Sequence, residues 1–494
     1  MSSRQIASST LWQLGSQVIM AALSMVAVKL VTIGLSKELA GYYNSAYGSL
    51  QLFGILADFG LYAVAVREVS RAADRDRALG AVTIVRCGTI AGALLLALLL
   101  VWFVPSWQAT PLPIAVTIAA LVPLFTLLAG TLRVAFQVAY RMHFVFIAEV
   151  SQRAVTVALI GLLILSGIRA SGDTGSLYLF LLMGGIGAFL LFLTSAIFAR
   201  WVLGVRPRAD RTMAIHLLRL AAPYTAAYLS LALLRQFDVT LIALLRPDFA
   251  LQNAAYGFAL RITEMAFLVP TFLLNSVLPT LSARLARQED VRTLLGRTLL
   301  ILLALGSAGA LFGLIWARPI MLALTSPAYL ASDGHPGADT ALAIQSLAIA
   351  CGGVMLYAFY VLLAQHAWKP LVSWLSAGAA ASVLLNVFLI PRFGFVGAAW
   401  TSVAIHASLA AALFTCSMRS LPPRISRAAL ARWALFTVAS AAVLLFLRWV
   451  TPGGVWSLIG MAAGAVSVAL LAVATGLLRF PQTLSPAELQ KQAE

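Results

Sequence analysis

Residues 80–104 read GAVTIVRCGTIAGALLLALLLVWFV and contain one charged side chain, Arg86. An α-helix rises about 1.5 Å per residue, so about 20 such residues cross a hydrocarbon core of roughly 30 Å. The stretch therefore predicts a membrane-spanning helix.

The whole chain repeats this pattern. It has 494 residues, of which 61% are apolar and 10% are charged, whereas a soluble protein carries about a quarter charged residues. Fourteen apolar stretches are long enough to span a bilayer: 10–33, 43–66, 80–104, 113–136, 145–167, 176–199, 217–245, 254–281, 294–316, 340–364, 371–390, 395–418, 429–450 and 455–478. The composition excludes a soluble enzyme and predicts an all-α polytopic membrane protein with about 14 transmembrane helices.

The basic residues predict the topology. The net charge is +17, which in a soluble protein would suggest nucleic-acid binding. Here most of the excess lies in short loops: if the N-terminus is cytoplasmic, the cytoplasmic loops and tails carry 22 Lys and Arg and the outward loops carry 6. The positive-inside rule then predicts that both termini are cytoplasmic, and no nucleic-acid partner is expected.

A short repeat predicts the architecture. Ala46-Tyr47-Gly48 opens the second span and Ala255-Tyr256-Gly257 opens the eighth, 209 residues later. The same offset aligns the first span with the seventh. Each span of the first half and its equivalent in the second half are therefore six spans apart, which is an even number. The two halves therefore share one orientation, which indicates a pseudo-two-fold axis along the membrane normal.

This repeat divides the chain into four parts. We expect an N-terminal six-helix bundle over 1–205, a C-terminal six-helix bundle over 206–420, an additional transmembrane helix pair over 421–480 and a cytoplasmic tail over 481–494. Pro422 and Pro423 break the helix before the extra pair.

Residues 386–401, NVFLIPRFGFVGAAWT, connect the eleventh and twelfth predicted spans. This stretch resembles a signature of the polysaccharide-transporter branch (Wzx-type O-antigen and exopolysaccharide repeat-unit flippases) of the multidrug/oligosaccharidyl-lipid/polysaccharide (MOP) superfamily. Further similar stretches are 41–43, 56–61, 66–68 and 278–282. The motif itself favours an architectural role, because Pro391 ends a helix, Gly394 permits a tight turn and Gly397 permits close helix packing.

The resemblance implies a function. Such proteins are flippases that move undecaprenyl-pyrophosphate-linked oligosaccharide units from the cytoplasmic to the outer leaflet, for exopolysaccharide, capsule or O-antigen (lipopolysaccharide) biosynthesis. The implied location is the bacterial cytoplasmic (inner) membrane. The lipid-linked oligosaccharide and the lipid bilayer are the implied partners, together with polysaccharide polymerase and chain-length machinery. Fourteen spans also resemble the lipid II flippases, whose likeness suggests that the last two helices form a groove for the polyprenyl tail.

Charged residues deep in the spans are the candidate functional residues. Each costs about 2.5 to 3.5 kcal/mol to insert, so such residues usually face a polar cavity. Guanidinium groups stay charged and bind phosphate oxygens bidentately, and we therefore assign Arg261, Arg235 and Arg153 to the pyrophosphate and sugar headgroup. Lys29 is a fourth candidate. The acids assigned to ion coupling or gating are Asp58, Asp238, Glu264 and Glu149.

An alternative for most of these charges is mutual neutralisation. Residues three or four apart share one helix face, and this spacing relates three pairs: Glu149 with Arg153, Arg235 with Asp238, and Arg261 with Glu264. Both alternatives remain open for each pair. Asp58 has no local partner, which favours ion coupling or a salt bridge between bundles, whereas Arg86 and Arg133 lie near cytoplasmic ends and are expected to snorkel.

Two other functions compete with the flippase. A lipid II-type or multidrug (MATE-like) cation-coupled exporter would have the same fold. A membrane enzyme acting on lipid-linked sugars would need catalytic groups in an outer loop, and residues 317–339 contain Asp333, His335 and Asp339. We expect a transporter, not an enzyme, that works by alternating access without a metal or cofactor, because the histidines and the three cysteines show no metal-ligand spacing.

Overall fold

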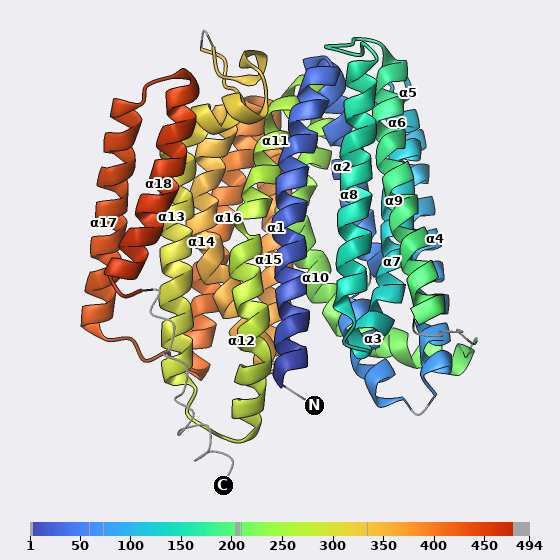
Figure 1. Cartoon of the computed structure of the whole chain (residues 1–494), viewed down its shortest axis with the longest axis vertical. Coiled ribbons are helices and arrows are strands. Elements are labelled where there is room, and N and C mark those ends of the chain that lie inside the picture. Colours follow the sequence, from blue (N-terminus) through green and yellow to red (C-terminus); the bar gives the residue numbers. More distant parts are fainter. Residues whose placement is uncertain are drawn as a thin grey trace. The chain divides into compact units, whose positions relative to one another are not determined.

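The computed structural model describes residues 3–58, 60–72, 74–202, 208, 210–332 and 334–477. The side chain of Arg235, the residue Asp333 and the predicted tail over 481–494 lie outside the described residues. Within the described ranges the chain is helical (Figure 1), with isolated backbone bridges between Leu35 and Ser171 and between Ser332 and His335.

The first half of the chain contains α1 Ser3–Gly34, α2 Lys37–Asp58, α3 Leu61–Arg71, α4 Arg75–Phe103, α5 Pro105–Gln108, α6 Leu112–Ala119, α7 Leu121–Val138, α8 Met142–Leu165 and α9 Thr174–Val202. The second half contains α10 Arg211–Leu245, α11 Phe249–Ala266, α12 Leu268–Ala286, α13 Arg292–Leu324, the 3-10 turn η1 Pro327–Tyr329, α14 Ala338–Ala364, α15 Trp368–Phe393 and α16 Phe395–Ser420. The chain continues with α17 Arg427–Val450 and α18 Gly454–Ala474.

The all-helical polytopic architecture predicted from the sequence is confirmed. Among the described residues, 11 helical stretches are long and apolar enough to cross a membrane. The other three predicted spans coincide with α1, with α2 followed by α3, and with α10. Pro391 does not end its helix as predicted, because α15 continues to Phe393; the turn follows at Gly394, whose φ is 58°.

Three predicted spans are each built from two helices. The second span breaks between α2 and α3, where Gly60 has a φ of 58° that favours glycine. The fourth span breaks at Ala120, and the eighth breaks at Phe267. Phe267 is the repeat equivalent of Asp58, the last residue of α2, because the offset is 209 residues. The second and eighth spans therefore share a break as well as a sequence motif, as expected of two copies of one unit.

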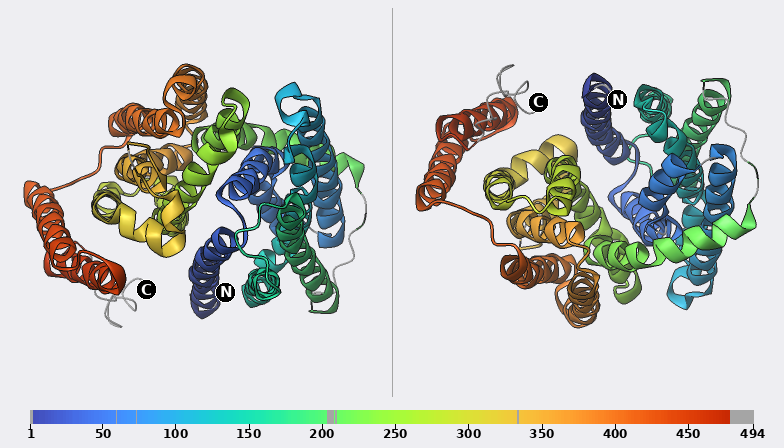
Figure 2. Two further views of the ribbon diagram at one scale, coloured as in Figure 1. Left: turned by 90° about the horizontal axis from the view of Figure 1, so that it is seen from above. Right: turned by 90° about the horizontal axis from the view of Figure 1, so that it is seen from below.

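One compact unit holds residues 1–261, 321–341 and 372–405. Its N-terminal helices pack closely: α1 lies along α8, and α7 lies along α9. The beginning of α10 crosses α3 and α4 (Figure 2), where Ala214 and Leu217 join a buried apolar cluster with Leu61 and Val82. Unit 1 thus contains all of the first half and parts of the second.

The other compact unit holds residues 262–320, 342–371 and 406–494. Within it, α17 and α18 form an antiparallel pair (Figure 1). This pair packs on α13, because Ala304 and Phe436 share a buried cluster and the Thr437 hydroxyl lies 3.4 Å from the Ser307 hydroxyl. Both units are discontinuous in sequence, so the division into bundles at residues 205 and 420 stays a prediction.

Helix starts and outer surfaces follow local chemistry. Asp210 caps α10 by accepting a hydrogen bond from the Met213 backbone, and Ser426 caps α17 by accepting one from the Ala429 backbone.

Large apolar side chains remain exposed along the spans, including Leu99. Such a surface is stable in hydrocarbon and not in water.

Candidate functional site

The site begins where α2 meets α11. The Asn44 side chain donates a hydrogen bond to the Asn253 backbone carbonyl at 3.1 Å. The Asn253 side chain donates to the Ser45 hydroxyl at 2.9 Å and to the Val239 carbonyl at 3.0 Å. Asn44, Ser45 and Asn253 are all buried. Asn44 and Asn253 are 209 residues apart, so equivalent positions of the two repeats meet here.

Glycines allow this crossing to be close. A Cβ at Gly41 would overlap the carbonyl oxygen of Ala250, its own repeat equivalent. A Cβ at Gly257 would lie 2.8 Å from the Asn44 side chain. The crossing therefore requires glycine at both places, one on each helix.

Arg261 lies on α11, about two turns beyond Asn253. Its guanidinium carbon is 5.4 Å from the ring centre of Tyr43 and 5.7 Å from that of Tyr47, both on α2. These are cation–π distances. The predicted headgroup residue is thus held against two aromatic rings.

Arg153 of α8 joins the same group. It lies within electrostatic range of Arg261, Tyr43 and Tyr47, and its Nε is buried without a hydrogen-bond partner. Within the part of the chain that the structure describes, neither arginine forms a salt bridge. The structure therefore brings together two of the four residues that we assigned to the headgroup.

Asp238 forms a separate buried site. Its two carboxylate oxygens accept hydrogen bonds from the Tyr256 hydroxyl at 2.7 Å and from the Asn386 side chain at 2.8 Å. Asp238 is 2% exposed, and in the described residues it has no salt bridge. Tyr256 belongs to the repeat motif and Asn386 begins the motif at 386–401, so both motifs supply a partner to this carboxylate.

Asp58 has a partner on α4, in the same compact unit, which the sequence did not indicate. Arg86 of α4 donates to the Asp58 carboxylate at 2.6 Å and to the Ala57 carbonyl at 3.4 Å. Arg86 is 1% exposed, so the prediction that it snorkels is wrong. It lies at the carboxyl end of α2, where a cation is favoured because the terminal carbonyls lack helical partners.

Glu149 pairs with a different arginine from the one four residues away. Arg133 of α7 donates to Glu149 at 2.8 Å and lies 5.8 Å from the ring centre of Tyr62. Packing of α7 on α8 thus gives Glu149 a partner on a neighbouring helix, and Arg133, which we expected to snorkel, is paired with this carboxylate.

The remaining candidates are Lys29, Glu264 and Arg235. Lys29 donates to the Thr325 backbone carbonyl at 2.6 Å. Glu264 lies half-buried on α11. The side chain of Arg235 is outside the described residues.

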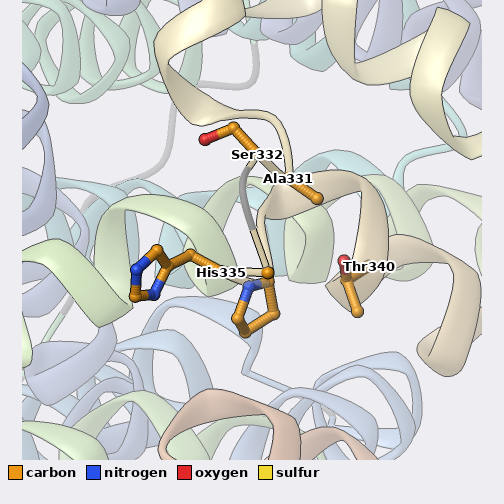
Figure 3. Close-up of a pocket in the computed structure, with 6 residues that line it drawn as sticks. Ala331, Ser332, His335 and Thr340 are labelled. Carbon is orange, nitrogen blue, oxygen red and sulfur yellow. The ribbon is translucent and has the colours of Figure 1, made fainter.

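The loop proposed for an enzymatic alternative lines a cavity of about 360 Å³. Ser332, His335 and Thr340 line it, but Figure 3 shows their side chains pointing in different directions. The Asp339 carboxylate stabilises the loop, because it accepts a hydrogen bond from the Ala331 backbone at 2.8 Å. Among the described residues, no group of three or more His, Cys, Asp or Glu could hold a metal ion.

Solved membrane transporters share this fold. The lipid II flippase MurJ in an inward closed conformation matches with a TM-score of 0.66 and 14% identity over 94% of this chain and 97% of that chain. An inward-facing multidrug resistance MATE family transporter of the MOP superfamily matches with a TM-score of 0.62 and 11% identity over 83% and 98%. An outward-facing multidrug resistance MATE family transporter matches with a TM-score of 0.56 and 13% identity, over 84% of this chain and 95% of that chain. The protein is therefore a membrane protein with the MOP transporter fold.

The sequence gives a narrower assignment. The family model "Polysaccharide biosynthesis protein" matches residues 6–284, more than half of the chain. The chain belongs to the polysaccharide biosynthesis protein family, which confirms the resemblance seen in the sequence. A comparison with curated proteins gives no match.

Proposed function

We propose that this protein is a flippase that moves undecaprenyl-pyrophosphate-linked oligosaccharide units across the bacterial cytoplasmic membrane, from the cytoplasmic to the outer leaflet. The observation that carries the proposal is the neighbouring pair Arg153 and Arg261, which has no salt bridge among the described residues. Two like charges on neighbouring apolar helices repel each other and are costly to insert. A diphosphate supplies at least two negative charges and neutralises both.

Rival functions fit this pair less well. A cation exporter would face repulsion from two guanidinium groups. A lipid II-type cargo carries the same diphosphate, and mass spectrometry of co-purified lipids distinguishes it by its sugars. For the enzyme alternative, a turnover assay with lipid-linked sugar decides: bond formation or cleavage by the purified protein would end the flippase proposal.

The mechanism that we propose is alternating access by two six-helix bundles, with all fourteen predicted spans crossing the membrane. The crossing of α2 and α11 lies at the end predicted to face outward. Its hydrogen bonds between repeat-equivalent residues would close that end while cargo enters from the cytoplasm, and would separate when cargo leaves.

We place ion coupling at Asp238 and not at Asp58 or Glu149. The latter two carboxylates are neutralised by Arg86 and Arg133, whereas Asp238 is buried and bonded by two neutral donors. A carboxylate in such a place gains a proton or a cation readily, because an unneutralised buried charge is costly. Asp238→Asn is expected to remove the dependence of transport on the coupling ion, whereas Asp58→Asn keeps it.

Arg261 provides the direct test of the headgroup site. Arg261→Ala is expected to abolish polymer export in cells while the protein remains folded and inserted, because the diphosphate loses a charge-assisted partner. Arg261→Lys retains the charge without the bidentate geometry and is expected to keep partial export. Export is measured as surface polysaccharide per unit of inserted protein.

Arg448→Ala is the matched control. Arg448 also lies over an aromatic ring, 5.7 Å from the ring centre of Trp316, but it belongs to α17 in the other compact unit. Its replacement is expected to leave export unchanged. Wild-type export by Arg261→Ala would remove Arg261 from the site and overturn the proposed function.

A further inference from the structure

Two tyrosines of α2 hold the guanidinium of Arg261. Tyr43 and Tyr47 are one helical turn apart, their ring centres are 4.9 Å apart, and the angle between the ring planes is 66°. The guanidinium carbon lies 5.4 Å from one ring centre and 5.7 Å from the other. Both rings therefore attract the same cation.

The tyrosine pair is itself fixed by its surroundings. The Tyr47 ring packs edge-on against the Tyr43 ring, and Tyr43 is buried. A Cβ at Gly184 of α9 would lie 2.5 Å from the Tyr47 hydroxyl, so glycine there makes room for the hydroxyl. The Tyr47 hydroxyl therefore lies close against α9, and the Tyr43 ring lies close against the Tyr47 ring.

The tyrosine contacts hold Arg261 without a protein carboxylate. A guanidinium has five N–H donors in one plane, and among the described residues Arg261 forms no salt bridge. Its donors are therefore not engaged by a protein carboxylate and can bind an anion. Arg153 lies within electrostatic range of the same tyrosines, so the donors of two arginines are held near one place.

We propose that Tyr43 and Tyr47 are positioning residues that make the site selective for a diphosphate over a monophosphate. The rings attract the Arg261 cation and so offset its repulsion from Arg153. Each arginine can then bind a separate phosphate group of a diphosphate, whereas a monophosphate has a single group to offer. This inference rests on the proposed function, because it concerns the same headgroup site.

The test compares binding of two lipids to the full-length protein in nanodiscs. The probes are undecaprenyl pyrophosphate and undecaprenyl phosphate. The double variant Tyr43→Leu with Tyr47→Leu is expected to bind the diphosphate about 10-fold more weakly, as two lost cation–π contacts imply, and the monophosphate nearly as before. The double variant with phenylalanine at both positions keeps the rings and is expected to retain the wild-type preference.

Tyr42→Leu is the control for lost packing. Tyr42 lies on the same helix and its ring contacts Phe249 of α11 at a centre-to-centre distance of 5.4 Å. Its replacement weakens the same helix pair away from Arg261, and the ratio of the two affinities is expected to stay unchanged.

Three results would overturn the inference. The leucine variant could bind the diphosphate as the wild type does, it could lose both lipids equally, or the phenylalanine variant could lose as much as the leucine variant. Arg261→Ala separates this failure from that of the proposed function. If that variant loses diphosphate binding, the headgroup site stands without the tyrosines; if it binds normally, the proposed function itself fails.

Discussion

At the scale of single residues, the spacing of charges along one helix is a poor guide to their partners. Glu149 lies four residues from Arg153, yet it bonds to Arg133 on another helix. Asp58 has no cation nearby in the sequence, yet Arg86 lies 2.6 Å away. Arginine is long enough to reach a neighbouring helix, so helix packing decides the pairing.

The Arg86–Asp58 pair gives a testable consequence. Arg86→Leu is expected to lower the free energy of unfolding by about 1.5 to 3 kcal/mol, the usual range for a hydrogen bond to a charged group. Replacing Asp58 as well, in Arg86→Leu with Asp58→Asn, is expected to restore part of that loss because no unpaired carboxylate remains. Thermal unfolding in detergent measures both.

Arg77→Leu serves as the comparison for this pair. Arg77 also lies on α4 and pairs with Asp74, but both side chains are exposed, and such surface pairs contribute about 0 to 1 kcal/mol. Equal losses of stability in Arg77→Leu and Arg86→Leu would show that the buried pair has no special role at the α2–α3 break.

At the scale of helices, the internal repeat relates residues that meet in the structure, beyond the three identical residues that revealed it. The offset of 209 residues relates Asn44 to Asn253, which meet in the structure, and Gly41 to Ala250, which touch. Tyr47 and its equivalent Tyr256 both lie in buried polar groups, one with Arg261 and one with Asp238. From this motif we inferred only the repeat; the recurrence of a tyrosine in it was the signal that could have identified both residues.

The closeness of the crossing can be tested at Gly41. Gly41→Leu is expected to force the beginning of α11 away from α2, because its side chain would overlap the Ala250 backbone. In an otherwise cysteine-free protein, a cysteine at Asn253 is then expected to react with a membrane-impermeant thiol reagent added outside the cell. The same cysteine is expected to stay protected when Gly41 is present.

Gly92→Leu is the control at this scale. Gly92 lies within α4, and a Cβ there would meet nothing within 4 Å, so the variant adds the same bulk without moving a helix. Equal labelling of the Gly41→Leu and Gly92→Leu proteins would contradict a close-packed seal at the α2–α11 crossing.

At the scale of the whole molecule, the distribution of basic residues leads to a topology that can be measured. Alkaline phosphatase fused after α18, at residue 477, is expected to be inactive, because the enzyme matures only outside the cytoplasm. The same enzyme inserted in the loop near Gly334 is expected to be active. Activity of the C-terminal fusion would contradict the even number of spans and the cytoplasmic termini.

The sequence by itself determined the class of the protein, the apolar stretches that form its helices and the family. These depend on composition and on short motifs, which are local properties: a run of about 20 apolar residues spans a bilayer whatever surrounds it. Only the tertiary structure decided that Arg261 rests on Tyr43 and Tyr47, and that Asp238 is bonded by Tyr256 and Asn386. Such partners are far apart in the chain, and their distances are set by how helices pack.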